Sequence, residues 1–227
     1  SSSSRTPNNY SKGTPQVVLS YIKHLVDIVG VSQSDITIYD KSRYISTELF
    51  NKITAVYPNV LFMDETGNST YSNWSEDVVD YDCEVKWSEN LTLEREGGNP
   101  TYLPETVSQA DYLINLANLK GHNLAGVTMN AKNHFGTFYA HSEEYDYYGP
   151  KAAGVHFYMA AHDMGTCGGS GQWDICGCEM ETYNALVDLM GHEDIGDKTL
   201  LFILDALYCS KNQGSVKPNK WSMSPFN

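Results

Sequence analysis

The stretch that decides the fold is DITIYDKSRYISTELFNKITAVYPNVLFMD, residues 35–64. Residues 35–39 predict a strand that ends at Asp40. Residues 46–56 then carry apolar side chains on one face of a helix that begins with a Ser-Thr cap. Residues 60–63 are wholly apolar, which is typical of a strand buried on both faces. Two strand–helix units in a row imply a parallel sheet.

Helical and strand patterns continue on both sides of this stretch. Residues 14–30 predict a helix that begins with Thr-Pro and stops at a glycine. Residues 112–117 and 200–204 predict two further strands, the second of them buried, and residues 179–190 predict a helix. We therefore predict an α/β fold in a single domain, residues 1–227, with a mostly parallel sheet flanked by helices in a Rossmann-like three-layer arrangement.

Residues 65–105 break this rhythm and predict a polar, β-containing insertion over the sheet. Residues 83–87 and 91–95 are short and β-like, and they could pair as a hairpin. The insertion also carries three N-x-S/T triplets, which mark exposure and make the chain a candidate glycoprotein. These triplets begin at Asn68, Asn73 and Asn90.

Composition excludes two classes of partner. The 227-residue chain has 15 Lys+Arg against 28 Asp+Glu, and its formal net charge of −13 repels phosphate backbones and anionic lipid surfaces. The sequence also lacks a run of about 18 consecutive apolar residues, which a membrane-spanning helix needs. We therefore expect neither nucleic-acid binding nor a transmembrane segment.

The five cysteines form no C-x-x-C pair, so neither a zinc ribbon nor an iron–sulfur cluster is expected. Cys167 lies in a glycine-rich stretch with Cys176 and Cys178, and a disulfide from Cys167 to one of these two would restrain that loop. Three unpaired thiols are the alternative. Together with the acidic, lysine-poor composition, this loop favours an extracytoplasmic location: secreted, periplasmic or at the cell surface.

Polar residues follow four of the predicted strands. In open parallel sheets, ligands bind beyond the carboxyl ends of the strands, because the loops converge there. Asp40, Asp64 and Asp205 each end a predicted strand. Ser42 and Arg43 come just after the first of them. We expect these side chains to gather at one rim of the sheet, with helix capping as the alternative role for the aspartates.

The fourth strand runs into the segment KGHNLAGVTMNAKNHFG, residues 120–136. Its lysine, amide and imidazole side chains lie among glycines that let backbone approach a ligand, so it resembles a cradle for a carboxylate or phosphate. If residues 127–134 are helical, the side chains at 128 and 132 share one face. A solvated loop with surface lysines is the alternative. The candidate side chains are Lys120, His122, Thr128, Lys132 and Asn133.

Residues 110–138, ADYLINLANLKGHNLAGVTMNAKNHFGTF, resemble the signature of the uncharacterised family catalogued as domain of unknown function 362. That signature is a strand, then K-x-H, then G-[VI]-T-x-x-x-K-N-x-x-G. The similarity extends to residues 14–30, 36–45, 58–67 and 200–208. The resemblance implies an α/β fold whose motif residues line a site, and a chain that is incomplete at both ends; it brings no established reaction. The matching positions are Lys120, His122, Gly126, Thr128, Lys132, Asn133 and Gly136.

The histidines at 141, 156, 162 and 192 are further candidates, for a metal site. His156 and the pair His162-Asp163 flank an apolar run, and these three residues could bind a divalent metal. His141 or His122 would complete the shell. The spacing from 156 to 162 does not place both imidazoles on one face of a helix, so ordinary packed or surface histidines are the alternative.

We therefore expect the chain to bind a small anionic ligand at the strand ends, with a divalent metal and an enzymatic reaction both left open. Lys120 and Lys132 would supply charge, and His122 would act as general acid or base. Asn133 would orient the ligand, and Asp40 and Asp205 would be carboxylate partners or metal ligands. The alternative function is a non-catalytic surface or assembly protein that self-associates through the tyrosine-rich residues 139–158.

Overall fold

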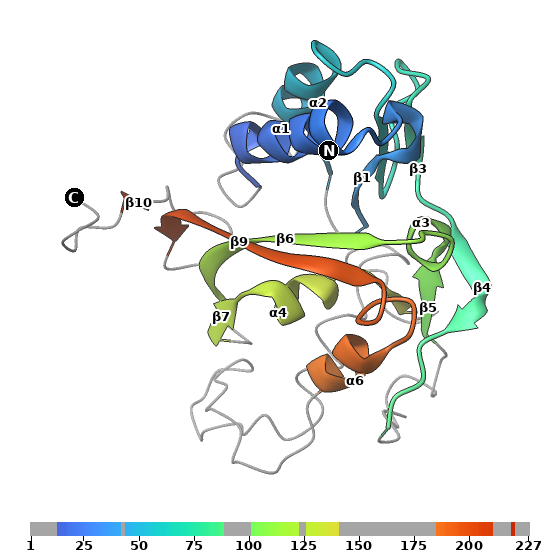
Figure 1. The fold of residues 1–227 in the computed structure, drawn as a ribbon. Coiled ribbons are helices and arrows are strands. Elements are labelled where there is room, and N and C mark those ends of the chain that lie inside the picture. The colour runs from blue at the N-terminus through green and yellow to red at the C-terminus, as the bar shows by residue number, and fades with distance from the viewer. Residues whose placement is uncertain are drawn as a thin grey trace.

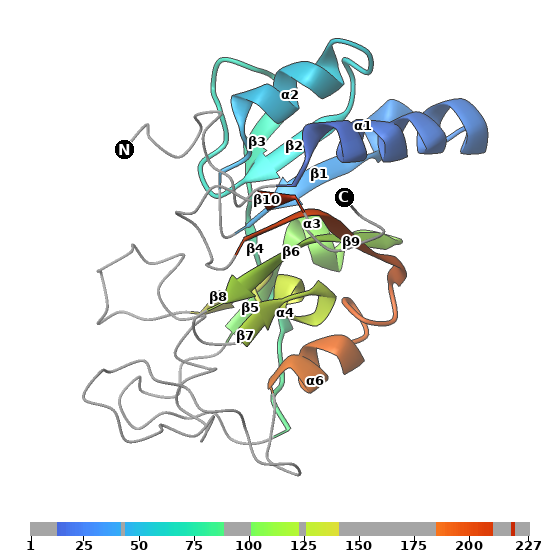
Figure 2. The ribbon, with the colours of Figure 1, turned by 90° about the vertical axis from the view of Figure 1, so that its left-hand side faces the viewer.

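The structure is a computed structural model, and it describes residues 13–41, 44–88, 101–122, 126–140, 185–210 and 219–220. The described strands form three sheets, with helices packed around them (Figures 1 and 2). Two hydrophobic clusters lie between these elements.

The first sheet is wholly parallel and comes from the stretch around residues 35–64. It contains β1 (Thr37–Asp40), β2 (Leu61–Asp64) and β3 (Trp74–Glu76), with β2 in the middle. A 3₁₀ turn, Gln33–Asp35, precedes β1. Asp40 and Asp64 are register partners, so the carboxyl ends of β1 and β2 lie side by side.

Two helices accompany this sheet and pack together (Figure 1). The first, α1 (Pro15–Lys23), continues into a π-helical turn, His24–Val29, and the left-handed Gly30 (φ 86°) ends it. The second, α2 (Thr47–Thr54), begins at Ser46, whose Oγ accepts the Leu49 N–H at 3.2 Å. Both helices therefore start and end close to where their sequence signals predict.

Aromatic rings dominate the interior of this region. The Phe50 ring centroid lies 4.8 Å from Phe62, 4.4 Å from Tyr71 and 4.7 Å from Trp74. Such ring pairs add to the stabilisation that burial provides. We call this set the aromatic cluster; its buried members are Ile22, Ile36, Ile45, Leu49, Phe50, Ile53, Tyr57, Val60, Phe62 and Trp74.

The second sheet is mixed. Its centre is the parallel pair β6 (Leu113–His122) and β9 (Thr199–Ser210). Two short antiparallel strands flank this pair: β7 (Gly126–Thr128) lies beside β6, and β10 (Asn219–Lys220) beside β9. Figures 1 and 2 show α1 and α2 on one side of this sheet, and α4 (Asn130–His134) and α6 (Ala185–Gly191) on the other.

The third sheet is antiparallel and includes part of the predicted insertion. Its strands are β4 (Val79–Glu84), β5 (Thr101–Pro104) and β8 (Tyr139–Ala140), and α3 (Glu105–Ser108) follows β5. The second hydrophobic cluster joins this sheet to β6, α4 and α6. We call it the long-range cluster; its buried members are Val85, Leu103, Val107, Leu113, Phe135, Phe138, Leu189 and Ile195.

The α/β class and the parallel pairing within residues 35–64 are confirmed. The described strands nevertheless form three sheets instead of one mostly parallel sheet, and a Rossmann-like three-layer arrangement is not seen among them. In the first sheet β3, from the predicted insertion, pairs with one edge of β2. β6 pairs instead with β7 and β9 in the second sheet.

The predicted insertion does contain strands, as expected: β3, β4 and β5 all lie within it. Its internal pairing differs from the expected hairpin, because β4 pairs with β5; residues 91–95 lie outside the described residues. The strand predicted as buried at residues 200–204 is also different. Leu200, Leu201 and Phe202 are exposed, since pairing at the edges of β9 covers neither of its faces.

The described helices are all too short or too polar to cross a bilayer.

Candidate functional site

The β6–β7 hairpin places Lys120 opposite Thr128. Side chains of directly opposite residues project from the same face of a sheet. Alternation along β6, together with the register that pairs Asn118 with Asp205, places these two residues on that face as well. We call it the Lys120 face. It brings together three of the predicted site residues, Lys120, Thr128 and Asp205.

Thr128 is the most unusual member of the Lys120 face. Its side chain is 7% exposed, and its Oγ1 has no hydrogen-bond partner in the described part of the chain. A buried hydroxyl without a partner costs about 1–3 kcal/mol, so such groups are rare in folded proteins. This hydroxyl therefore has an unused hydrogen-bonding capacity within the described part of the chain.

Asp205 joins the Lys120 face to the start of α1. One carboxylate oxygen, Oδ2, accepts the Thr14 N–H at 3.4 Å, and Oδ1 accepts the Leu207 N–H at 3.3 Å. A carboxylate at this position also interacts favourably with the dipole of α1. Thr14 itself makes no side-chain cap bond, so Asp205 satisfies a backbone donor that the predicted Thr14 cap does not.

Asn133 and Lys132 approach the sheet from its opposite face. Residues 126–128 form a strand, so the expected helix over residues 127–134 begins only at Asn130. The helix α4 packs against the face of β6 that carries Asn115: Asn133 Nδ2 donates to Asn115 Oδ1 at 3.0 Å. Lys132 Nζ lies 5.1 Å from the Phe135 ring centroid. Lys120 and Lys132 thus belong to different faces of the sheet.

A partly buried amide network, with Asn115 as its buried member, fixes α4 on the sheet. Asn115 Nδ2 donates to the Asn130 carbonyl at 2.9 Å, and Asn130 Nδ2 donates to the Asn115 and Ile203 carbonyls at 3.1 and 2.8 Å. Because Asn115 is on β6 and Ile203 on β9, the network crosses both central strands. Asn133 belongs to this network, which gives it a positioning role in α4.

His134, at the end of α4, is 3% exposed and lies edge-on to Phe202, with ring centroids 6.2 Å apart. Its Nε2 is 3.4 Å from Thr199 Oγ1. Burial lowers the pKa of His134 to about 4, because the charged imidazolium is poorly solvated there. The ring is therefore neutral at pH 7, and it packs as part of the interior.

The carboxyl end of the parallel sheet contains a buried polar group of its own. Lys41, directly after β1, is 2% exposed, and its Nζ lies 4.1 Å above the Tyr139 ring centroid. The Tyr139 hydroxyl donates to the Asp77 carbonyl at 3.2 Å. Burial raises the pKa of Asp77, although a hydrogen bond from Thr106 opposes that shift. Asp40 lies next to this group at the end of β1.

Asp64, at the end of β2, bonds to loop backbone, which differs from the helix capping that was the alternative for the strand-end aspartates. Its Oδ2 accepts the Ile45 N–H at 2.9 Å, and its Oδ1 accepts the N–H groups of Thr66 and Gly67 at 3.2 and 2.9 Å. These bonds fix the loops after β1 and β2. The structure thus assigns Asp64 to loop geometry.

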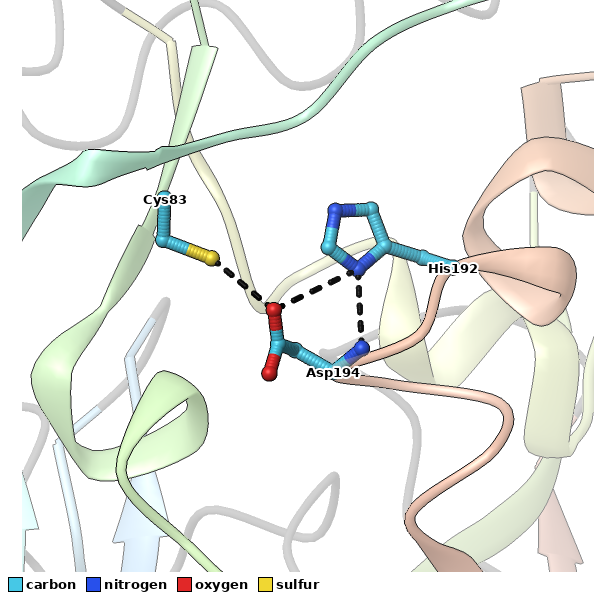
Figure 3. Close-up of side chains that lie close together, drawn as sticks. All are labelled: Cys83, His192 and Asp194. Atoms are coloured by element: carbon cyan, nitrogen blue, oxygen red, sulfur yellow. Dashed lines mark hydrogen bonds and ion pairs between the residues drawn. The ribbon is translucent and has the colours of Figure 1, made fainter.

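A separate cluster of side chains joins β4 to the turn after α6 (Figure 3), and the sequence analysis named His192 but neither Cys83 nor Asp194. The Cys83 thiol donates to Asp194 Oδ2 at 3.1 Å, and His192 Nδ1 lies 4.0 Å from the same oxygen. Lys198 Nζ pairs with Asp194 Oδ1 at 2.7 Å. One donor atom from each of Cys83, His192 and Asp194 lies within 4.8 Å of the other two.

The ionisation of this cluster follows from its burial and its hydrogen bonds. Burial, followed by the acceptor Asp194, raises the pKa of the Cys83 thiol to about 12. Burial also opposes ionisation of Asp194, but the bonds from Lys198 and Cys83 outweigh it and lower the pKa of Asp194. The Cys83 thiol is therefore neutral, and it bonds to the Asp194 carboxylate, whose negative charge Lys198 balances.

Several predicted residues lie outside the described residues, or have described backbone only. His122 is in strand register opposite Gly126, which places it two residues beyond Lys120 on β6. The residues outside the described ranges are Ser42, Arg43, His156, His162, Asp163, Cys167, Cys176 and Cys178.

The sequence carries little local signal for the residues that its analysis did not name, Lys41, Cys83 and Asp194. The burial of Lys41 depends on Tyr139, roughly a hundred positions away, so no local pattern marks it. Cys83 is likewise distant from its partners. His192 and Asp194 form an H-x-D pair just after a helix, which is a weak local signal for ligands that share one turn.

One family model matches residues 6–224, nearly the whole chain, and its description is Domain of unknown function (DUF362). Searches of curated proteins and of solved structures gave no match.

Proposed function

Since the chain belongs to the family described as Domain of unknown function (DUF362), we propose a function from its own side chains: it binds a small anionic ligand, a carboxylate or phosphate, on the Lys120 face. The observation that carries this proposal is the buried, unpartnered Oγ1 of Thr128 directly opposite Lys120. An oxyanion would accept a hydrogen bond from the hydroxyl and pair with the ammonium group.

The surroundings of Thr128 support an anion more than a cation or an apolar ligand. Lys120 is the cation on this face, and the carboxylate of Asp205 already accepts two backbone N–H groups. The glycines at 121 and 126 lie in the two paired strands, and a glycine has no side chain to keep a ligand from the backbone. In an enzymatic version of this function, His122 at the end of β6 would move the proton.

The experiment uses Thr128→Val, which keeps the shape of the side chain and removes the hydroxyl. Orthophosphate and succinate are the probes, and binding is measured by the rise in unfolding temperature as each is added. We expect the wild type to be stabilised by at least one probe. T128V and Lys120→Met should lose most of that stabilisation. Thr54→Val is the matched control, because the Thr54 hydroxyl bonds within α2 at 2.9 Å.

The stability of unliganded T128V separates a binding residue from a structural one. If the hydroxyl serves only a ligand, T128V should be more stable than the wild type by about 1 kcal/mol, because an unsatisfied buried group is removed. Equal probe binding by T128V and wild type would overturn the proposal. A loss of stability in T128V would show that the hydroxyl has a structural partner, which also contradicts it.

A further inference from the structure

The cluster between β4 and the α6–β9 turn has the composition and spacing of a metal site, and we propose that Cys83, His192 and Asp194 bind a divalent ion of the zinc class. A thiolate, an imidazole and a carboxylate are the three ligand types that zinc takes in proteins. This site is separate from the Lys120 face and does not depend on the function proposed for that face.

The distances between the donor atoms fit a single ion. An ion about 2.3 Å from sulfur and about 2.0 Å from nitrogen and oxygen, in tetrahedral geometry, places its ligands about 3.3–3.5 Å apart. In the structure, Cys83 Sγ and Asp194 Oδ2 are 3.1 Å apart, and His192 Nδ1 is 4.0 Å from that oxygen. The three donor atoms lie within 4.8 Å of one another, and side-chain rotation would close the remaining gaps to binding distance.

The turn that carries two of the ligands is built to a fixed shape. The His192 carbonyl accepts the N–H groups of Ile195 and Gly196 at 3.0 and 2.8 Å. A Cβ on Gly196 would lie 1.7 Å from the Met190 carbonyl oxygen, so only glycine fits there. The Asp194 N–H donates to the lone pair of His192 Nδ1 at 3.1 Å, and on metal binding this hydrogen bond would be exchanged for the bond to the ion (Figure 3).

Lys198 orients the Asp194 carboxylate through the oxygen that the ion would not use. It bonds Asp194 Oδ1 at 2.7 Å and the Ser108 carbonyl at 2.7 Å, which leaves Oδ2 facing Cys83 and His192. Outer hydrogen bonds of this kind orient a ligating carboxylate. The ion would replace the hydrogen on Cys83: the S–H bond breaks, a sulfur–metal bond forms, and one proton leaves to solvent. Water would complete the fourth position.

The first test uses Co²⁺ as a spectroscopic substitute for zinc, on a variant that retains Cys83 while the other four cysteines are serine. A near-ultraviolet thiolate-to-cobalt band, with visible bands of tetrahedral intensity, must then come from Cys83. We expect one Co²⁺ per chain, displaced by Zn²⁺. Absence of the thiolate band from this variant and from the wild type would overturn the proposal.

The second test removes the other ligands one at a time in that single-cysteine background. Asp194→Asn and His192→Asn should each weaken Co²⁺ binding by at least about 100-fold, the upper end of what loss of an outer partner causes. Asp197→Asn is the matched control, since this exposed aspartate lies in the same turn. Equal affinity in D194N and D197N would show that Cys83 binds the metal with other partners, and would overturn this ligand set. Circular dichroism verifies that each variant is folded.

Discussion

The aromatic cluster and the long-range cluster differ in how far along the sequence their residues are drawn. The aromatic cluster takes every buried member from residues 22–74, so strand, helix and strand follow one another closely. The long-range cluster takes its members from residues 85–195, so it joins segments that are far apart in the sequence. One interior is assembled from neighbouring segments, whereas the other needs most of the chain.

The two regions also differ in what they bury. Around the aromatic cluster, the interior contacts are mainly ring on ring. The long-range region contains a neutral imidazole, an amide network, an unpartnered hydroxyl and a thiol–carboxylate contact. Polar groups in an interior weaken it unless each has a partner, so we expect the long-range region to be more sensitive to the loss of a polar partner. Four measurements test this contrast.

The largest expected effect is in the aromatic cluster. Phe50→Ala should lower the free energy of unfolding by about 3–5 kcal/mol, because it removes a ring that contacts three others and leaves a cavity. Urea denaturation measures the loss. Hydrogen exchange should rise most in β1–β3; an equal rise in β6 and β9 would show that the two regions are one cooperative unit.

Acid should destabilise the long-range region next most strongly. The folded-state pKa of His134, about 4, lies below its ordinary value near 6.5, so the unfolded chain binds more protons between these pH values. Stability from this residue is therefore full above pH 6.5 and is lost as the pH falls toward 4, on the order of 3 kcal/mol in total. His134→Gln should remove that part of the pH dependence. Urea titrations at pH 7 and pH 5 give the comparison, and parallel profiles would contradict it.

Removing a buried amide should affect the two regions unequally. Asn115→Ala should cost about 2 kcal/mol, because Asn133 Nδ2 and the Asn130 carbonyl each lose a buried partner. Asn73→Ala, in the first region, removes a bond of 2.8 Å to the Val60 carbonyl and a longer, exposed one of 3.3 Å to the Pro58 carbonyl, and should cost about 1 kcal/mol. Chemical denaturation distinguishes them. A larger loss for N73A would reverse the assignment of polar stabilisation to the second region.

The smallest expected effect concerns side-chain capping at the N-termini of α1 and α2, beside the aromatic cluster. Ser46→Ala should cost about 1 kcal/mol, because Ser46 Oγ caps α2. Thr14→Ala should cost clearly less, since the Thr14 side chain makes no cap bond and Asp205 accepts its N–H. Thermal unfolding measures both. Equal losses would mean that the Thr14 hydroxyl also contributes.

Local pattern explains which parts of the fold could be predicted. The residues of β1, α2 and β2 carry their capping and apolar signals within a few positions, and these elements form as expected. The polar run from Asn118 to His122 has no such signal, yet it continues β6 because strands pair with it on both edges. The apolar segment Leu200–Phe202 was predicted to be buried but is exposed. Apolar composition alone does not determine which faces of a strand are covered.

The candidate site divides in the same way. Lys120 and Thr128 stood out in the sequence as polar groups among glycines, and the structure places them opposite each other. Lys132 and Asn133 were grouped with them, but the turn between β7 and α4 carries these two to the other face. The contact of Cys83 with Asp194 spans more than a hundred positions, which is beyond any spacing rule for a single motif.

The parallel pairing of β6 with β9 also determines when the protein can fold during its synthesis. A ribosome adds about 5–20 residues per second, so β6 waits on the order of ten seconds before residues 199–210 exist to pair with it. The first sheet and its helices need only the first third of the chain and can form at once. Until β9 emerges, the edge of β6 that pairs with β9 stays unpaired, while the first sheet can already be folded. During this interval the nascent chain is most prone to aggregation.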